Sequence, residues 1–457
     1  MSQEKTIVLK RVLSGADTLA LSFGAMIGWS WVLLTGKWIE SAGTLGAALA
    51  FIGGGMVILC VALTYAELAA AMPNAGGEHV YSLRALGVRW SFICSWAMIF
   101  GYVSVAAFEA VALPYALIQF FPMIDSGKLW RIAGWDVTVG FVAVGVVAGV
   151  LLTWLNIRGV RPAAVVQKIV TIVILITGLA FISGAGLHGD VENFQPLFSD
   201  GYRGVFVVLV MVPIMFVGFD VIPQTAEEIN LPSKTIGRLV VLSVIAAIIW
   251  YALMIVGVAL SLDADQRAAA GLTTADASGV VWGRESARSV LIAGGIAGIL
   301  TSWNAFLIGA SRLIYALAKA GQLPQFLADV HPSYGTPYKA LWLIGGITLV
   351  SPWFGRPILV WLINAGSFGV IIAYVLVSLS FLVLRVREPN MCRPYKLPFG
   401  MLLGVIAAVL SLAMTCLFLP GSPAALAWPQ EWGICLLWSV LGLYFWRKSC
   451  ADRQRQR

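Results

Sequence analysis

The chain has 457 residues, of which 60% are hydrophobic and only 11% are charged, and its mean hydropathy is +0.88. An ordinary soluble domain carries about a quarter charged residues, so this composition excludes a water-soluble fold of this length. The formal charge of +8 does not by itself indicate nucleic-acid binding, because the basic residues gather in alternate loops between apolar segments.

Apolar segments of about 20 residues, long enough to cross a bilayer as helices, recur along the whole chain. Twelve spans are predicted, at 15–36, 44–71, 91–121, 137–155, 162–185, 203–225, 238–261, 289–318, 340–354, 357–384, 399–419 and 431–446. With both termini in the cytoplasm, most of the 30 basic residues fall in cytoplasmic segments, as the positive-inside rule requires. We therefore expect a single all-α polytopic domain in the lipid bilayer of the inner or plasma membrane, with a cytoplasmic start (1–14) and a basic cytoplasmic tail (447–457).

Two of the spans carry helix-breaking residues near their middle. Span 1 contains Gly24 and Gly28, and span 6 contains Pro213, Gly218 and Pro223. A helix that is broken inside hydrocarbon frees backbone N–H and C=O groups, which cannot stay bare there and therefore bind substrate or ions. The alternative is that the glycines only allow close packing of helices.

The positions of these two spans suggest an internal repeat. Spans 1 and 6 correspond if residues 15–185 and 203–384 are two inverted copies, with two further helices over 399–446. Interrupted spans in corresponding positions are the best sequence indication of a transporter's central site. For Gly53–Gly55 in span 2, by contrast, we prefer the helix-packing interpretation.

Two acidic residues lie deep in predicted spans. Glu109 is about midway along span 3, and Asp220 follows the break in span 6. A charge at the bilayer centre costs roughly 2.5 kcal/mol or more, so such residues are functional candidates. Neither acid has an evident basic partner at its depth, so each either contacts a substrate amine or carries a coupled proton. The alternative is a protonated acid that hydrogen-bonds a neighbouring helix.

Four sequence blocks, in order along the chain, resemble the amino acid–polyamine–organocation superfamily of permeases. They are GAMIG at 24–28, YAEL and MPNAGGEHVY at 65–81, FVGFD with AEEINLP at 216–232, and ASRLIYALA at 310–318. The resemblance covers nearly the whole chain. It implies a five-plus-five inverted repeat with two added C-terminal helices, alternating access, and transport driven by an H⁺ gradient, a Na⁺ gradient or exchange.

The same resemblance places the substrate between the two breaks, against spans 3 and 8. The expected substrate-binding residues are Gly24, Ala25, Met26, Ile27, Gly28, Trp29, Ser30, Glu109, Phe216, Gly218, Phe219, Asp220 and Phe306. For ion coupling we expect Asp220 and Glu109, or the hydroxyls of Thr301 and Ser302, which in sodium-coupled relatives join span 1 carbonyls around the ion. Polar packing between helices is the alternative for the two hydroxyls.

Two positions depart from the family pattern. The usual Gly-Ser-Gly of span 1 reads Gly28-Trp29-Ser30 here, so Trp29 either fills part of the pocket or stacks on substrate. A polyamine or organic cation without an α-carboxylate is therefore the alternative substrate. Proton-coupled relatives often carry a lysine midway along span 5, where this chain has Ile174, with Lys168 nearer the cytoplasm. We do not expect a lysine-based proton switch.

Other classes of function have little support in the sequence. The six cysteines and three histidines show no metal-ligand spacing, and no nucleotide-binding, hydrolase or zinc-protease motif occurs. We predict no enzyme activity, no cofactor, no metal and no nucleic-acid partner. A channel or a membrane-embedded sensor is less favoured, because there is no filter-like loop and no soluble domain. The sequence thus predicts a secondary transporter of an amino acid or related amine.

Overall fold

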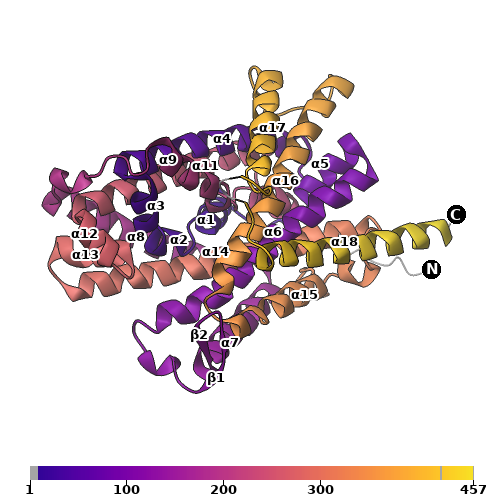
Figure 1. Ribbon diagram of the computed structural model, residues 1–457. Helices are drawn as coiled ribbons and strands as arrows, with labels where there is room; N and C mark the ends of the chain where they lie inside the picture. The colour runs from indigo at the N-terminus through magenta and orange to yellow at the C-terminus, as the bar shows by residue number, and fades with distance from the viewer. Residues whose placement is uncertain (1–8, 423–424, 456–457) are drawn as a thin grey trace.

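The computed structural model describes residues 9–422 and 425–455, and nearly all of its regular structure is helical (Figure 1). Within these residues, seven helices are long and apolar enough to cross a membrane. They are α4 (Thr44–Ala71), α6 (Val88–Leu117), α7 (Val139–Ile157), α8 (Val160–His188), α11 (Ser233–Ser261), α14 (Glu285–Lys319) and α16 (Ile358–Arg387). The fold is that of a multi-pass membrane protein, whereas the count of twelve spans stays a prediction.

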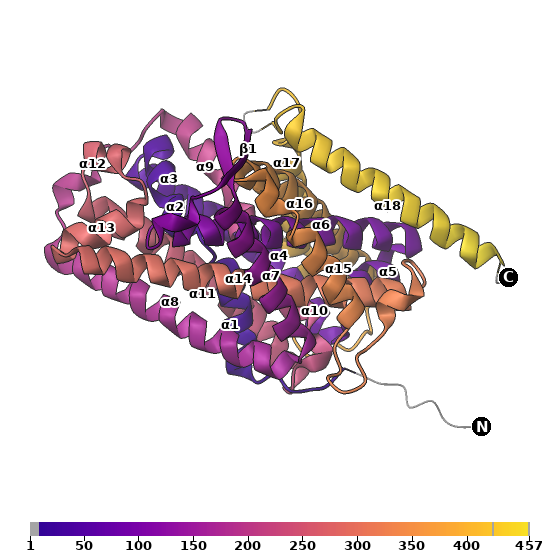
Figure 2. The same ribbon diagram turned by 90° about the horizontal axis from the view of Figure 1, so that it is seen from below.

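Helices outside this group of seven occupy the other predicted spans. They are α1 (Gly15–Met26), α9 (Gly201–Met215), α15 (Tyr338–Thr348), α17 (Gly400–Cys416) and the final α18 (Gln430–Arg455). Most of the predicted tail 447–457 continues α18, and its last two residues lie outside the described part of the chain, as do residues 1–8. In Figure 2, α18 runs along the outer flank of the molecule.

Both predicted breaks are present. Span 1 is divided into α1, α2 (Ser30–Leu33) and α3 (Thr35–Ala42), with Ile27–Trp29 outside any helix. In span 6, α9 ends at Met215 and the short α10 (Val221–Gln224) follows after five residues. The last turn of α9 contains Pro213, which has no N–H to continue the helix hydrogen bonds.

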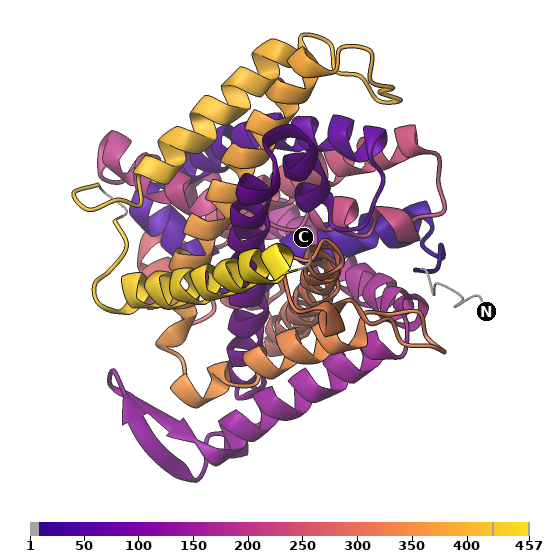
Figure 3. The ribbon, with the colours of Figure 1, turned by 90° about the vertical axis from the view of Figure 1, so that its right-hand side faces the viewer.

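The segments between the long helices contain short elements for which the prediction gave no bounds. The helices among them are α5 (Gly77–Leu86), α12 (Ala264–Ala269), α13 (Thr273–Trp282), η1 (Pro122–Ile124), η2 (Val191–Phe194), η3 (Ala226–Glu228), η4 (Gln325–Ala328) and η5 (Ser351–Phe354). An antiparallel hairpin of β1 (Lys128–Ile132) and β2 (Trp135–Thr138) projects from the body before α7 (Figure 3). Its tight turn uses Gly134 with φ +83°, a conformation that favours glycine. Strands this short give too little alternating pattern to be predicted.

The broken helices lie at the centre of the bundle. Helix α1 packs against α8, α11 and α14, while α6 packs against α14 and α16. The last helix, α18, is fixed to this core through Trp438, which stacks on Trp96 of α6 with ring centroids 4.6 Å apart. The indole N–H of each tryptophan donates a hydrogen bond to the backbone carbonyl of the other.

Both described ends of the chain reach the same face of the molecule. Lys10 donates a hydrogen bond to the carbonyl of Ser333, and Ser449 donates one to the carbonyl of Gly321. Both acceptors lie in the segment between α14 and α15. We call this side of the molecule the terminal face.

The glycines of α4 only partly follow the packing interpretation. A Cβ atom at Gly54 would lie 2.8 Å from Val212, and one at Gly55 would lie 2.6 Å from Ile248. A Cβ at Gly53 would meet nothing within 4 Å, so the packing interpretation was wrong for that position. Only Gly54 and Gly55 allow close approach of neighbouring helices.

Candidate functional site

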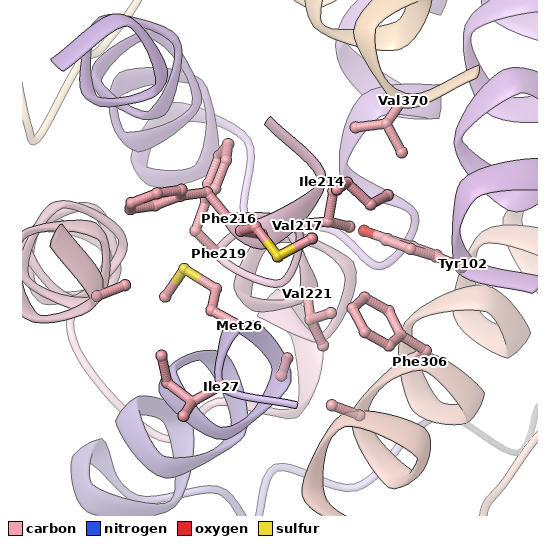
Figure 4. Close-up of a cluster of buried hydrophobic side chains, with 14 of the residues drawn as sticks. Met26, Ile27, Tyr102, Ile214, Phe216, Val217, Phe219, Val221, Phe306 and Val370 are labelled. Atoms are coloured by element: carbon pink, nitrogen blue, oxygen red, sulfur yellow. The ribbon is translucent and has the colours of Figure 1, made fainter. Parts of the chain in front are cut away.

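The two broken helices touch each other at their breaks. Gly218 has φ +133°, and a Cβ atom there would lie 2.6 Å from Cβ of Ala25 and 2.9 Å from the backbone N of Met26. Side chains from both breaks, including Met26, Phe216 and Phe219, meet here, with Tyr102 and Phe306 on the opposite side (Figure 4). The absence of a side chain at Gly218 is what lets the two backbones approach.

We expect Gly218→Ala to abolish transport, because the new methyl group would push the two breaks apart and strain the backbone. The measurement is substrate uptake per folded protein, with folding checked by size-exclusion chromatography in detergent. Gly53→Ala is the matched control and should transport normally, since open space surrounds that position. Normal transport by the Gly218 variant would contradict this account of the contact.

The breaks expose backbone groups that no described residue pairs. The N–H groups of Gly28 and Trp29, and that of Phe219, donate no hydrogen bond within the described ranges. Such buried donors are normally satisfied by protein, water or ligand. Each of these N–H groups is therefore available to an acceptor that the protein itself does not supply.

A tyrosine that sequence reasoning missed connects the two breaks. The hydroxyl of Tyr251, on α11, donates to the carbonyl of Met26 at 2.7 Å and lies 3.4 Å from that of Met215. It also lies 3.1 Å from the hydroxyl of Ser30. Tyr251 thus contacts the last backbone carbonyl of α1 and that of α9.

Trp29 is fully buried, and its ring lies directly against Gly295 of α14. Its indole N–H has no hydrogen-bond partner among the described residues. In this arrangement the ring fills the space between the span 1 break and α14, and its N–H remains free to donate.

Glu109 lies at the break in span 1. A Cβ atom at Gly28 would lie 2.5 Å from Oε1 of Glu109 and 3.3 Å from Oγ of Ser302, so these three residues surround one point. Glu109 is 1% exposed, and its Oε2 has no hydrogen-bond partner in the part of the chain that is described. This acid therefore retains a free oxygen beside the unpaired N–H groups of the break.

Asp220 lies in a different environment. The hydroxyl of Tyr102, on α6, donates to one carboxyl oxygen at 2.9 Å, and that of Tyr374, on α16, donates to the other at 2.9 Å. The N–H of Gly218 adds a bond of 3.1 Å. Asp220 therefore faces α6 and α16, and the two deep acids have separate surroundings.

The sequence held a usable signal for one of these tyrosines. Tyr102 precedes Glu109 by seven residues, about two helical turns, so both lie on the same face of α6. Its ring also packs against Phe306, with centroids 5.5 Å apart. The two phenylalanines of the span 6 break diverge: Phe216 packs against Tyr251, whereas Phe219 packs against Tyr374.

Polar side chains of α8 and α14 surround the middle of α1. Thr301 donates to the carbonyl of Gly24 at 2.9 Å. Gln167 and Thr171 each donate to the carbonyl of Ala20 at 3.3 Å. An amide chain continues from Gln167 through Asn304 to Asn156, with two bonds of 2.8 Å. The carbonyl oxygens of Ala20 and Gly24 thus already accept hydrogen bonds from the protein.

An ion pair joins α14 to the segment that follows the span 6 break, on the side of the terminal face. Arg312 of α14 binds Glu228 with Nε–Oε1 2.7 Å and Nη2–Oε2 3.3 Å, and both side chains are fully buried. The carbonyl of Glu228 also accepts hydrogen bonds from the N–H groups of Val12 and Leu13, each at 2.9 Å. The segment before α1, the exit of span 6 and α14 are thus held together. The side chains at the two breaks and the two deep acids are all buried.

We expect Arg312→Met to lower the thermal stability markedly, because removing one partner of a buried ion pair costs about 3–5 kcal/mol. Adding Glu228→Leu should restore most of that stability, since no unpaired charge then remains. Thermal unfolding in detergent measures both effects. If the single variant unfolds at the wild-type temperature, the pair is not buried in the purified protein.

Comparison with known proteins supports a transport role. A family model described as amino acid permease matches residues 13–441. The branched-chain amino acid permease BcaP of Bacillus subtilis is 28% identical over 411 residues, which is 85% of this chain and 84% of that protein. The methylthioribose transporter of the same organism is 26% identical over 417 residues, covering 89% and 88%. The aspartate-proton symporter of Bacillus subtilis is 25% identical over 423 residues, which is 88% of this chain and 78% of that protein.

Proposed function

The chain belongs to the amino acid permease family and is a secondary transporter of amino acids or related compounds; from this premise we propose that it is a proton-coupled permease for a small zwitterionic amino acid. One observation carries the proposal: Glu109 keeps a free carboxyl oxygen at the span 1 break, beside backbone N–H groups that nothing else pairs. The ammonium group of an amino acid can pair with the acid, and its carboxylate can accept hydrogen bonds from the unpaired N–H groups.

In the proposed complex, the substrate amine contacts Glu109, and the substrate carboxylate accepts hydrogen bonds from the N–H groups of Gly28 and Trp29. The remaining surroundings are apolar, with Met26, Phe216 and Phe306 all buried. An apolar side chain of the substrate therefore fits better than a charged one, because an unpaired charge there would lose its hydration without compensation.

Proton coupling is favoured over sodium coupling by the surroundings of α1. The carbonyls of Ala20 and Gly24 already accept hydrogen bonds from Gln167, Thr171 and Thr301. A Na⁺ ion bound by Thr301 and Ser302 would have to compete with these hydrogen bonds for the same carbonyl oxygens. Asp220, in contrast, sits at the break of span 6 and can exchange a proton while its two tyrosine partners hold it in place. We therefore propose Asp220 as the proton carrier.

We further propose the membrane arrangement that goes with this role. Residues 15–185 and 203–384 form two inverted repeats, and both termini lie in the cytoplasm of a cell whose plasma or inner membrane holds the protein. The shared position of both described chain ends on the terminal face supports this topology. The Arg312–Glu228 pair would then close the cytoplasmic side.

The test is uptake of a labelled panel of amino acids and amines into liposomes that contain the purified protein. We expect saturable accumulation of an apolar amino acid under an inward proton gradient, with no effect of sodium. Uptake of a carboxylate-free amine in place of amino acids would support the organic-cation alternative. Absence of any gradient-driven or exchange transport would refute the proposal.

A further inference from the structure

A third acid is buried away from the breaks, at the start of α5. Glu78 is fully buried, and neither of its carboxyl oxygens makes a hydrogen bond with a described residue. Helix α5 is a loop helix between α4 and α6, and it packs against α6, α10 and α16. An acid buried without a partner costs free energy, so its presence here calls for a function.

Further polar groups on α5 and on the elements around it are also buried without partners among the described residues. The hydroxyl of Tyr65 on α4, both polar atoms of Gln224 on α10, and the hydroxyls of Tyr81 and Ser378 have no hydrogen-bond partner in the described chain. We call these four residues and Glu78 the α5 cluster. Buried polar groups that no protein group pairs are commonly hydrogen-bonded to ordered water in folded proteins.

The cluster connects to Asp220 through two helices. Gln224 follows Asp220 by four residues, and its carbonyl accepts a hydrogen bond from the N–H of Gly76, just before α5. Ser378 follows Tyr374, a partner of Asp220, by four residues on α16. Residues four apart lie on the same helical face. Both helices thus carry polar groups from Asp220 toward the terminal face.

Tyr65 lies close to both Asp220 and Glu78. Its ring packs against Tyr374, a hydrogen-bond partner of Asp220, with centroids 5.9 Å apart, and against Phe219, which precedes Asp220 in the chain, with centroids 5.3 Å apart. Its hydroxyl also interacts electrostatically with both Glu78 and Asp220. Tyr65 therefore lies between the Asp220 site and α5.

Burial raises the pKa of Glu78 well above its usual value, and the neighbouring Asp220 carboxyl raises it further. The backbone N–H of Glu78 and the nearby Tyr65 hydroxyl lower this pKa by a smaller amount. The titratable groups that interact with Glu78 are Asp220, Tyr65, Tyr81, Cys94, Tyr102 and Tyr374. None of these is basic. His79, next along the chain, is also buried, which lowers its pKa to about 4 and keeps it neutral.

We propose that Glu78 is a proton-relay carboxyl that connects Asp220 to the terminal face, an inference that rests on the proposed proton coupling. The O–H bond of protonated Asp220 breaks, and its proton passes to the Tyr65 hydroxyl, which gives its own proton to the Glu78 carboxylate. Asp220 is left as a carboxylate held by Tyr102 and Tyr374. Glu78 then releases the proton to water at the terminal face.

The test compares Glu78→Gln with wild type and with Glu40→Gln, an exposed acid on α3, in proteoliposomes. Two rates are measured: net uptake driven by a proton gradient, and exchange of labelled for unlabelled substrate, which requires no proton release. We expect the initial rate of net uptake to fall about tenfold or more in the Glu78 variant, with exchange within about twofold of wild type. Glu40→Gln should match wild type in both.

Three outcomes would overturn the inference in distinguishable ways. Wild-type net uptake in Glu78→Gln means that Glu78 carries no proton. Equal loss of net uptake and exchange means that it has a structural role. A wild type that ignores the proton gradient refutes the proposed function itself, and the relay with it.

A second measurement does not depend on how the variant folds. A hydrophobic carbodiimide modifies protonated carboxyl groups in apolar surroundings, and mass spectrometry of the treated wild-type protein locates the modified residues. We expect labelling of Glu78 that decreases as the pH rises. Labelling that is absent, or that does not change with pH, would show that Glu78 does not exchange protons and would overturn the relay.

Discussion

Asp220→Asn is expected to abolish proton-driven accumulation of substrate while leaving exchange measurable. Asparagine has nearly the shape of aspartate, but it cannot bind and release a proton. It also places an NH₂ group against a tyrosine hydroxyl that, in the wild-type protein, donates a hydrogen bond to the carboxylate. The mismatched hydrogen bond should cost about 1–3 kcal/mol of stability. The measurement is the final accumulation level in proteoliposomes with and without an imposed proton gradient.

Asp265→Asn is the matched control, because Asp265 is an exposed acid on the loop helix α12. It should accumulate substrate as wild type does. The final level distinguishes Asp220 from Glu78: loss of the proton carrier removes the gradient response altogether, whereas loss of a relay only slows it. Accumulation by Asp220→Asn that still follows the proton gradient would exclude Asp220 as the carrier.

Glu109→Gln is expected to weaken substrate binding about 10- to 100-fold, since a charge-assisted hydrogen bond to the substrate amine is worth about 1.5–3 kcal/mol. The glutamine would keep the contact with Gly28 and Ser302 but would lose the negative charge. The measurement is the substrate concentration that gives half-maximal thermal stabilisation of the purified protein.

Glu192→Gln, at an exposed position in the short helix η2, is the control for this experiment and should bind substrate normally. Glu109→Asp should fall between the two, because it keeps the charge but shortens the side chain. If Glu109→Gln binds substrate as tightly as wild type, the amine does not contact Glu109, and the proposed orientation of the substrate is wrong.

The features that depend on local chemistry could be predicted from the sequence. Gly28, Pro213 and Gly218 indicated where the spans break, because glycine and proline act on their own backbone. The depth of Glu109 and Asp220 followed from their positions within apolar segments, because length along a helix determines depth. Both acids lie beside the breaks in the structure.

The partners of these acids could not be predicted in the same way. Tyr374 reaches Asp220 across 154 residues of sequence, and Tyr251 reaches Met26 across 225. Helical periodicity shows which side of a helix a residue occupies, but not which helix faces it. The separation of the two acids into different environments therefore emerged only from the packing, as did the burial of Glu78 on a loop helix.

The central claim, that substrate and proton move together, is tested most directly by measuring the pH inside proteoliposomes. A pH-sensitive dye trapped inside the vesicles would report the internal pH. Substrate is added outside, and no proton or sodium gradient is imposed. The account predicts that the interior acidifies as substrate enters, and that Asp220→Asn removes this acidification. Substrate entry without a pH change, together with accumulation driven by a sodium gradient, would contradict it.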